Sequence, residues 1–252
     1  MSAALSAASA PGTAPQAAFR SLRSDHTFFS AMSIAAACTI VIGFSRTYAR
    51  ALHASPPLPG FVHLHAAVFT SWLVLFVVQA SLVARGRIAL HRRLGVAGMA
   101  LAATMLLLGV FTAIQAARLG YLGVPGQEFP DAASFLLVPL RDITVFSTLV
   151  AFGLWNRGNP PAHKRAMLTA VLGGLMPPAA ARLPLVDRFL PAIGLILLLF
   201  LLAGPLYDFL HFRRVHHVYV WGGLMSILTI PPILAPIAMG HAWHAVAHFL
   251  MN

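Results

Sequence analysis

Charged residues are scarce in this chain: they make up 9% of its 252 positions, whereas hydrophobic residues make up 59%. A soluble domain carries about 25% charged residues. One core cannot hide so much apolar surface, which excludes an ordinary soluble domain and favours a protein whose solvent is lipid. Barrel strands alternate apolar and polar residues with period two, and the run over residues 195–202 does not alternate. The composition therefore predicts membrane-spanning helices.

Other absences narrow the function. Cys38 is the single cysteine, so no disulfide can form within the chain. Lys164 is the single lysine and lies at the edge of an apolar run, which excludes a retinal Schiff base inside a span. Gly-rich phosphate loops and nucleotide fingerprints are also missing. The net charge of +11 comes from arginines in short loops, so we expect contacts with membrane lipid headgroups and no nucleic-acid partner.

Seven apolar runs each come close to the roughly 20 residues that a helix needs to cross the hydrocarbon core. They predict an all-α, polytopic integral membrane protein with a single seven-helix transmembrane bundle within residues 26–239. Residues 1–25, rich in Ala and Ser, are expected to form a disordered tail, and residues 240–252 an interfacial C-terminal helix. The runs are 27–49, 61–84, 93–118, 132–156, 165–183, 187–210 and 217–239.

Three loops combine histidine with basic residues. Short cytoplasmic loops carry an excess of Lys and Arg. We therefore expect these loops inside, with the N-terminus inside and the C-terminus outside, in a bacterial cytoplasmic membrane. The clusters are His91-Arg92-Arg93, His163-Lys164-Arg165 and Arg213-Arg214-Val215-His216-His217.

Arg141 and Asp142 lie near the middle of the fourth apolar run. Charges at that depth face a bundle interior or a wet cavity and are paired. Neighbouring residues on a helix do not face each other, so each is expected to find its own partner, with Gln79, Gln115 and Asp208 as candidates. A proton path, a clamp for an anionic ligand and a structural polar network all fit this pair.

Four histidines are candidate ligands of b-type haem or of another transition metal: His65, His91, His163 and His216. His65 begins an aromatic stripe that continues with Phe69 at helical spacing, and a haem can lie against such a face. Histidines of the basic loops can ligate iron while their arginine neighbours hold the propionates. Helix packing and cations at the membrane interface explain the same residues without a cofactor.

On the opposite side, five histidines are candidate metal ligands. His241, His244 and His248 follow the i, i+3, i+7 spacing of one helix face, and imidazole suits Zn, Cu, Fe or Ni. His63 and His65 point about 200° apart on an ideal helix, so both reach one ion only if the helix is unwound. The alternative is an amphipathic helix with its histidines in water.

Residues 60–225 resemble, over most of their length, a group of uncharacterised bacterial multi-pass membrane proteins. This resemblance implies a multi-pass architecture and brings no activity with it. The His-Arg-Arg-Leu-Gly helix start also resembles those of membrane haem proteins of the cytochrome b561 and ferric-reductase kind, which implies haem. The motifs are His65-Ala66-Ala67-Val68-Phe69, Trp72, Gln79, His91-Arg92-Arg93-Leu94-Gly95, His163-Lys164-Arg165 and Trp221-Gly222-Gly223.

The leading expectation is a membrane redox or electron-transfer protein with haem b or a transition metal. One alternative is a transporter or small-ligand-binding protein built around Arg141 and Asp142. The other is a structural subunit of a larger membrane complex, without chemistry of its own. The sequence does not decide whether the protein is an enzyme.

Overall fold

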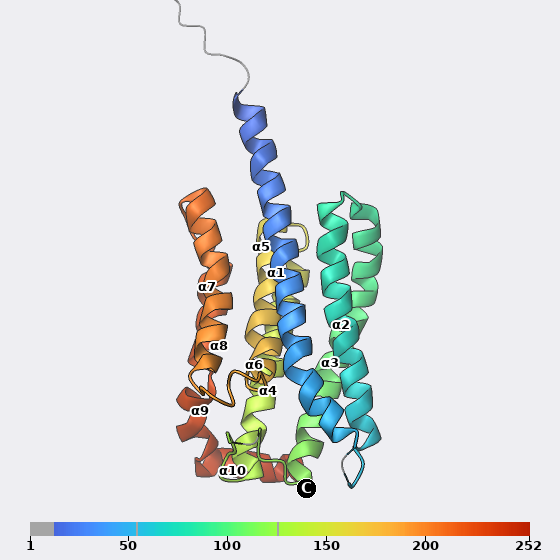
Figure 1. The fold of residues 1–252 in the computed structure, drawn as a ribbon, viewed down its shortest axis with the longest axis vertical. Coiled ribbons are helices and arrows are strands. Elements are labelled where there is room, and N and C mark those ends of the chain that lie inside the picture. Colours follow the sequence, from blue (N-terminus) through green and yellow to red (C-terminus); the bar gives the residue numbers. More distant parts are fainter. Residues whose placement is uncertain (1–12, 54, 125) are drawn as a thin grey trace, which may run out of the picture.

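The computed structural model describes residues 13–252 apart from residues 54 and 125. It is 80% helix and contains no strand among these residues, which confirms the all-α prediction. Long helices form the first half of the chain (Figure 1). α1 begins within the segment for which the sequence predicts a disordered tail, and residues 1–12 lie outside the described residues. The long helices are α1 (Thr13–Ala51), α2 (Gly60–Ala84), α3 (Ile88–Arg118) and α4 (Ala132–Trp155).

The second half is interrupted at prolines, which lack the N–H that continues a helix. One helical segment changes to a π-helical turn, η1, just before Pro177-Pro178. Another bends by 51° at the break before Pro231-Pro232. The elements are α5 (Pro160–Ala170), η1 (Val171–Leu175), α6 (Met176–Ala180), α7 (Ala192–Phe212), α8 (His217–Leu228), α9 (Pro231–Ala238) and α10 (His241–Met251).

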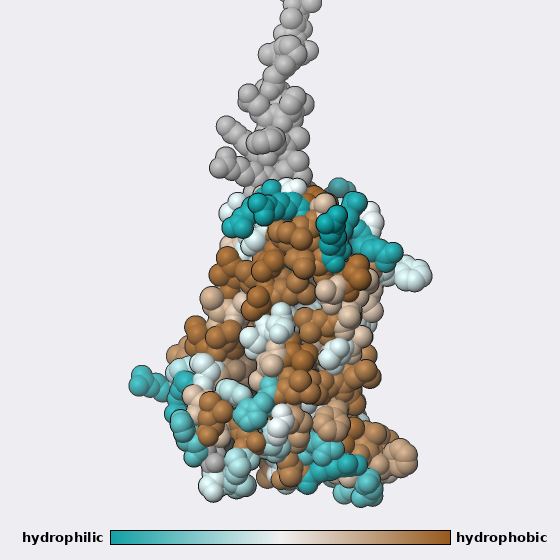
Figure 2. Space-filling view, turned by 90° about the vertical axis from the view of Figure 1, so that its right-hand side faces the viewer, coloured by the Kyte–Doolittle hydropathy of each residue, from teal (hydrophilic) through white to brown (hydrophobic). Residues whose placement is uncertain are grey.

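Several helices have the length and apolarity of membrane spans. Among the described residues, α1 from Ser24 onward, α2, α3, α4 and α7 qualify, and the bent pair α8 and α9 makes a sixth span if counted as one. Figure 2 shows apolar side chains over the middle of one face and hydrophilic ones gathered toward both ends. Leu107 and Leu199 are 73% and 71% exposed. A surface of this kind suits lipid, which confirms a membrane-type helical protein.

α4 is the most enclosed of these spans: 44% of its most apolar window is buried, against 17–22% for the others. It contacts α3, α5 and η1, and its residues Phe146 and Leu149 are fully buried in the main core. Its charged pair is therefore surrounded by protein. A charge enclosed in this way avoids the cost that it would have in the hydrocarbon.

The ends of the bundle differ in charge. The turns from α2 to α3, from α4 to α5 and from α7 to α8 all lie toward the upper end of Figure 1. These turns and the helix ends next to them carry the three clusters of histidine and basic residues. The acidic Glu128, Asp131 and Asp187 lie in the loops at the lower end, beyond α3 and before α7.

α10 lies across the lower end of the bundle and contacts α3 and α4 (Figure 1). The indole Nε1 of Trp243 donates to the Ala133 carbonyl at 2.8 Å, and Arg118 Nε donates to the Met251 carbonyl at 2.6 Å. Phe249, on the same helix, is 81% exposed. Residues 240–252 thus include a helix, α10, which is hydrogen-bonded to the end of α3 and the start of α4.

Candidate functional site

Arg141 and Asp142 lie inside the bundle, and each is 7% exposed. Arg141 Nη1 donates to Asp142 Oδ1 at 2.5 Å, and Arg141 Nε donates to Thr229 Oγ1 at 2.8 Å. Nη1 also donates to the Gly173 carbonyl at 2.9 Å, and Nη2 donates to the Ser226 carbonyl. One guanidinium therefore joins α4 to η1, to α8 and to the residue after α8.

Both carbonyls that Arg141 binds belong to helix breaks. A helical carbonyl accepts from the amide four residues on, or five residues on in a π-helix. For Gly173 these positions are Pro177-Pro178, which have no N–H. For Ser226 the position is Ile230, whose amide bonds elsewhere. A buried carbonyl without a partner costs about 1–3 kcal/mol, so Arg141 stabilises both interruptions.

The expectation that Arg141 and Asp142 find separate partners is wrong, because they bind each other. The spacing rule describes where side chains leave the helix, whereas the long arginine side chain folds back over its neighbour. Gln79 is not part of this network: its Nε2 donates to the His91 carbonyl at 3.2 Å. Asp208 pairs with another arginine.

Gly174 lets η1 lie directly against α4. A Cβ at this position would lie 2.6 Å from the Phe146 Cβ and 2.8 Å from the Asp142 carbonyl oxygen. Contacts this short do not occur between real side chains, and neither atom belongs to a flexible chain end. Glycine is therefore needed at the level where Arg141 reaches across to η1.

A second buried ion pair joins Arg165 and Asp208, and the sequence interpretation missed it. Arg165 Nε donates to Asp208 Oδ2 at 2.9 Å and Nη2 donates to Oδ1 at 2.5 Å, with side chains 5% and 1% exposed. The amide of His216 donates to the same carboxylate at 3.1 Å. Arg165 was interpreted as a topology marker. The sequence feature that indicates a partner for Arg165 is the acidic residue Asp208, which lies inside an apolar run.

Of the four histidines proposed as haem or metal ligands, the structure brings His91 and His163 together. Their ring centres lie 6.3 Å apart and the ring planes are nearly perpendicular. His163 Nδ1 is 2.7 Å from the Gly153 carbonyl. This contact fixes Nδ1 as the protonated nitrogen and leaves the Nε2 lone pair free. α3 supplies one imidazole and α5 the other, at the upper, basic end.

The other two histidines of that set have different surroundings. His216 stacks on His217 with ring centres 4.4 Å apart, and its Nδ1 accepts from the Val218 amide at 3.3 Å. Burial and then the nearby Arg165 cation lower the pKa of His216. His65 lies toward the other end of α2 and stacks on Phe69 with ring centres 4.0 Å apart. The sequence could not separate these histidines from the pair.

The five histidines of the second predicted metal site do not form a cluster. The described residues contain no group of three or more His, Cys, Asp or Glu side chains that could hold a metal ion. His63 Nδ1 is 2.6 Å from the Tyr48 hydroxyl. His244 Nε2 is 3.2 Å from Ser134 Oγ, and its ring centre is 6.1 Å from that of His248. His241 begins α10.

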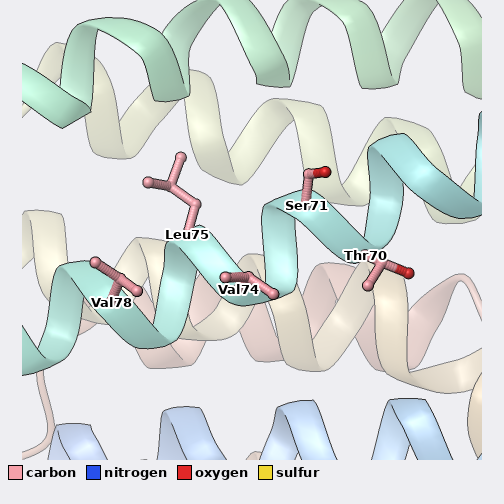
Figure 3. Close-up of a pocket in the computed structure, with 5 residues that line it drawn as sticks. All are labelled: Thr70, Ser71, Val74, Leu75 and Val78. Atoms are coloured by element: carbon pink, nitrogen blue, oxygen red, sulfur yellow. The ribbon is translucent and has the colours of Figure 1, made fainter.

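One groove lies on the outer face of α2 (Figure 3), with a volume of about 300 Å³. Its lining consists of Thr70, Ser71, Val74, Leu75 and Val78, and it contains no charged or imidazole group. Val74 is 59% exposed on this face. Its chemistry suits an acyl chain of a lipid better than a polar substrate.

Comparisons of this chain with protein-family models, with curated proteins and with solved structures found no match.

Proposed function

We propose that this is an integral membrane redox protein that holds a transition metal between His91 and His163, as a bare ion or as the iron of a b-type haem. The observation that carries the proposal is the separation of the two ring centres, 6.3 Å. A metal–imidazole bond is about 2 Å long, and the ring centre lies roughly 1 Å behind the nitrogen. Two imidazoles on either side of one metal therefore have centres about 6 Å apart.

The surroundings of the pair fit ligation. Metal-bound histidines donate their other ring N–H to a carbonyl, a carboxylate or water, and the contact between His163 Nδ1 and the Gly153 carbonyl has this form. The Gln79 amide holds the main chain at His91. Arg92 and Arg93 follow His91 and are exposed, where they can bind haem propionates or lipid phosphates. When bound, the metal supplies one-electron transfer.

Metal analysis and an absorption spectrum of the purified protein test this proposal. We expect stoichiometric Fe or Cu, with a Soret band if the iron is in haem. His91→Ala and His163→Ala should each lose most of the metal. His217→Ala is the matched control, since His217 is an exposed histidine at the same end. Wild-type protein without a Soret band and without stoichiometric Fe or Cu would refute the proposal.

In the proposed topology the chain crosses a bacterial cytoplasmic membrane seven times. The three basic loops lie on the cytoplasmic side. The segment 160–180 supports the seventh crossing, because α5, η1 and α6 follow without a loop and enter the core of the bundle. The common end of the basic loops supports the orientation. Labelling of single cysteines at residues 86 and 122 in intact cells tests it: residue 122 should react with an impermeant reagent and residue 86 should not.

A second candidate function is transport or small-ligand binding, favoured by the meeting of two helix interruptions at Arg141. Discontinuous helices surround substrate sites in many transporters. Closure on a ligand would then replace the hydrogen bonds of Arg141 to the Gly173 and Ser226 carbonyls with bonds to the ligand. Arg141→Lys keeps the charge but not these parallel bonds, so uptake or binding that is unchanged in a well-folded Arg141→Lys variant would exclude this function.

A further inference from the structure

The groove on α2 lies on a helix face that continues to the end of the helix. Val78 lines the groove (Figure 3). Arg85 follows seven residues later, which is close to two helical turns, so Arg85 stands above Val78 on the same face. The Arg85 amide donates to the Ser81 carbonyl at 3.1 Å, as in a regular helix, so this spacing holds up to Arg85. The apolar groove and an exposed cation therefore share one face of α2.

The turn from α2 to α3 leaves its arginine side chains free. The Gly86 amide donates to the Val83 carbonyl at 3.0 Å. The Arg87 amide donates to the Leu82 carbonyl at 2.8 Å. These two bonds, with Gly86 at a φ of 71°, form a Schellman motif, in which main-chain amides satisfy the last carbonyls of a helix. The side chains of Arg85 and Arg87 are therefore not needed to cap α2 and can bind another molecule.

Four exposed arginines gather at this turn and at the start of α3. They are Arg85, Arg87, Arg92 and Arg93. None of them makes an ion pair or a side-chain hydrogen bond within the described residues. The acids of the described residues at the same end of the bundle, Asp25 and Asp208, already pair with Lys164 and Arg165. The counter-ions of the four arginines must therefore come from outside the protein.

The groove lies at the depth of the hydrocarbon of one membrane leaflet. At roughly 1.5 Å per residue, Val78 is about 10 Å and Thr70 about 22 Å below Arg85 along α2. The headgroup region of a leaflet is roughly 5–7 Å thick, and its hydrocarbon is about 15 Å thick. A lipid whose phosphate lies at the level of Arg85 therefore has its acyl chains beside the groove. Figure 2 faces the side of α2 and α3, and it shows hydrophilic side chains at the upper end above an apolar middle.

We propose that the hairpin of α2 and α3 binds one anionic phospholipid, with its phosphate on Arg85 and Arg87 and one acyl chain in the groove between Thr70 and Val78. A guanidinium group binds phosphate through two parallel N–H bonds. The net negative charge of the lipid supplies the counter-ion that the acids of the protein do not supply. A zwitterionic lipid carries its own cation and lacks this advantage. The site depends on the groove and the arginines, and it does not rest on the proposed metal.

The first experiment tests the cations. Native mass spectrometry measures lipid retained by the purified protein during titration with phosphatidylglycerol or with phosphatidylcholine of the same acyl chains. We expect the wild type to retain one phosphatidylglycerol and to prefer it at least tenfold. Each arginine near anionic lipid contributes about fivefold to binding, so the double variant Arg85→Gln, Arg87→Gln should bind phosphatidylglycerol roughly 25-fold more weakly.

The matched control removes the same charge from another turn at the same end. Arg213 and Arg214 are exposed and belong to the turn from α7 to α8, on the far side of the bundle from α2 (Figure 1). The double variant Arg213→Gln, Arg214→Gln should bind phosphatidylglycerol like the wild type. If it loses as much binding as the Arg85 and Arg87 variant, the lipid responds to the charge of the whole end, and the proposed site is overturned.

The second experiment tests the groove with all arginines in place. Val74 lines the groove and is 59% exposed, so Val74→Phe fills the groove without entering the core. We expect this variant to lose at least fivefold in phosphatidylglycerol binding. Leu199→Phe is the control and should bind like the wild type, because Leu199 is 71% exposed on α7. Circular dichroism of both variants verifies that they are folded.

Two further outcomes contradict the proposal. Equal retention of phosphatidylglycerol and phosphatidylcholine by the wild type would show that the lipid charge is not recognised. Wild-type affinity in Val74→Phe would show that the arginines hold a phosphate group without help from the groove, so that an acyl chain is not part of the site.

Discussion

The Arg141 network and the His91–His163 pair differ in how completely their polar groups are bonded. Arg141 donates to a carboxylate, a hydroxyl and two carbonyls. At the pair, His163 is held at Nδ1 alone, and His91 Nδ1 has no protein partner among the described residues. Four of the five N–H groups of the Arg141 guanidinium are bonded to protein, so a ligand there would have to displace existing bonds, whereas the histidine pair has free nitrogens. The buried charge of Arg141 therefore has a structural role, and incomplete bonding distinguishes the histidine pair that we propose as the binding site.

The difference predicts the largest loss of stability at Arg141. Arg141→Met should destabilise the protein by about 3–5 kcal/mol, because it leaves the Asp142 carboxylate buried and unpaired and exposes two carbonyls to the core. Denaturation in SDS–detergent mixtures measures this. Arg157→Met is the matched control, since Arg157 is exposed, and should change stability by no more than about 0.5 kcal/mol. Similar losses in both variants would contradict the structural role.

Gly174→Ala should have the next largest effect. The added methyl group would lie 2.6 Å from the Phe146 Cβ, and overpacking of this kind costs about 1–3 kcal/mol. Gly223→Ala is the control, because a Cβ there meets nothing within 4 Å. Unfolding in the same detergent mixtures should separate the two variants. If both variants unfold like the wild type, η1 does not lie in direct contact with α4 at Gly174.

Asp131, the N-cap of α4, should show a smaller effect that depends on pH. Burial alone would raise the pKa of its carboxyl, but hydrogen bonds from Ser134 outweigh burial and lower the pKa. The carboxylate therefore stabilises the fold fully above its unfolded pKa of about 3.9, and this stability is lost as the pH falls through the lower folded value. Loss of the cap costs about 1 kcal/mol.

Two variants separate the charge of Asp131 from its capping role. Asp131→Ala should lower the melting temperature at neutral pH. Asp131→Asn keeps the cap and should remove only part of the acid dependence, seen in melting curves from about pH 6 down to about pH 2. A melting curve of Asp131→Asn with the full acid dependence of the wild type would assign that dependence to other carboxyls.

The smallest effect on stability is expected at the histidine pair. His163→Gln loses one bond to the Gly153 carbonyl, which contributes about 1 kcal/mol or less, and the apoprotein should unfold almost like the wild type. Its metal content should fall sharply, in contrast to the Arg141 variants. A His163→Gln protein that keeps its metal but unfolds as readily as Arg141→Met would reverse the comparison between the two regions.

Part of the candidate site was visible in the sequence. Arg141 and Asp142 stand out because charged residues inside an apolar run have few explanations. Their partners were not visible, because Gly173 and Ser226 offer main-chain carbonyls, and any residue type has one. The Arg165–Asp208 pair was not visible, because a basic residue at the end of a span also has another explanation. Such residues set the orientation of a protein in the membrane.

The sequence alone determined the helical, membrane-type architecture. When lipid is the solvent, it dictates the composition and length of whole runs of residues. The helix interruptions also have a local cause in the sequence, since Pro177 and Pro231 lack the amide that a continuing helix needs. Tertiary structure decided which of twelve histidines meet and which carbonyls Arg141 binds. Those contacts join helices far apart in the chain, and only packing sets the distances between them.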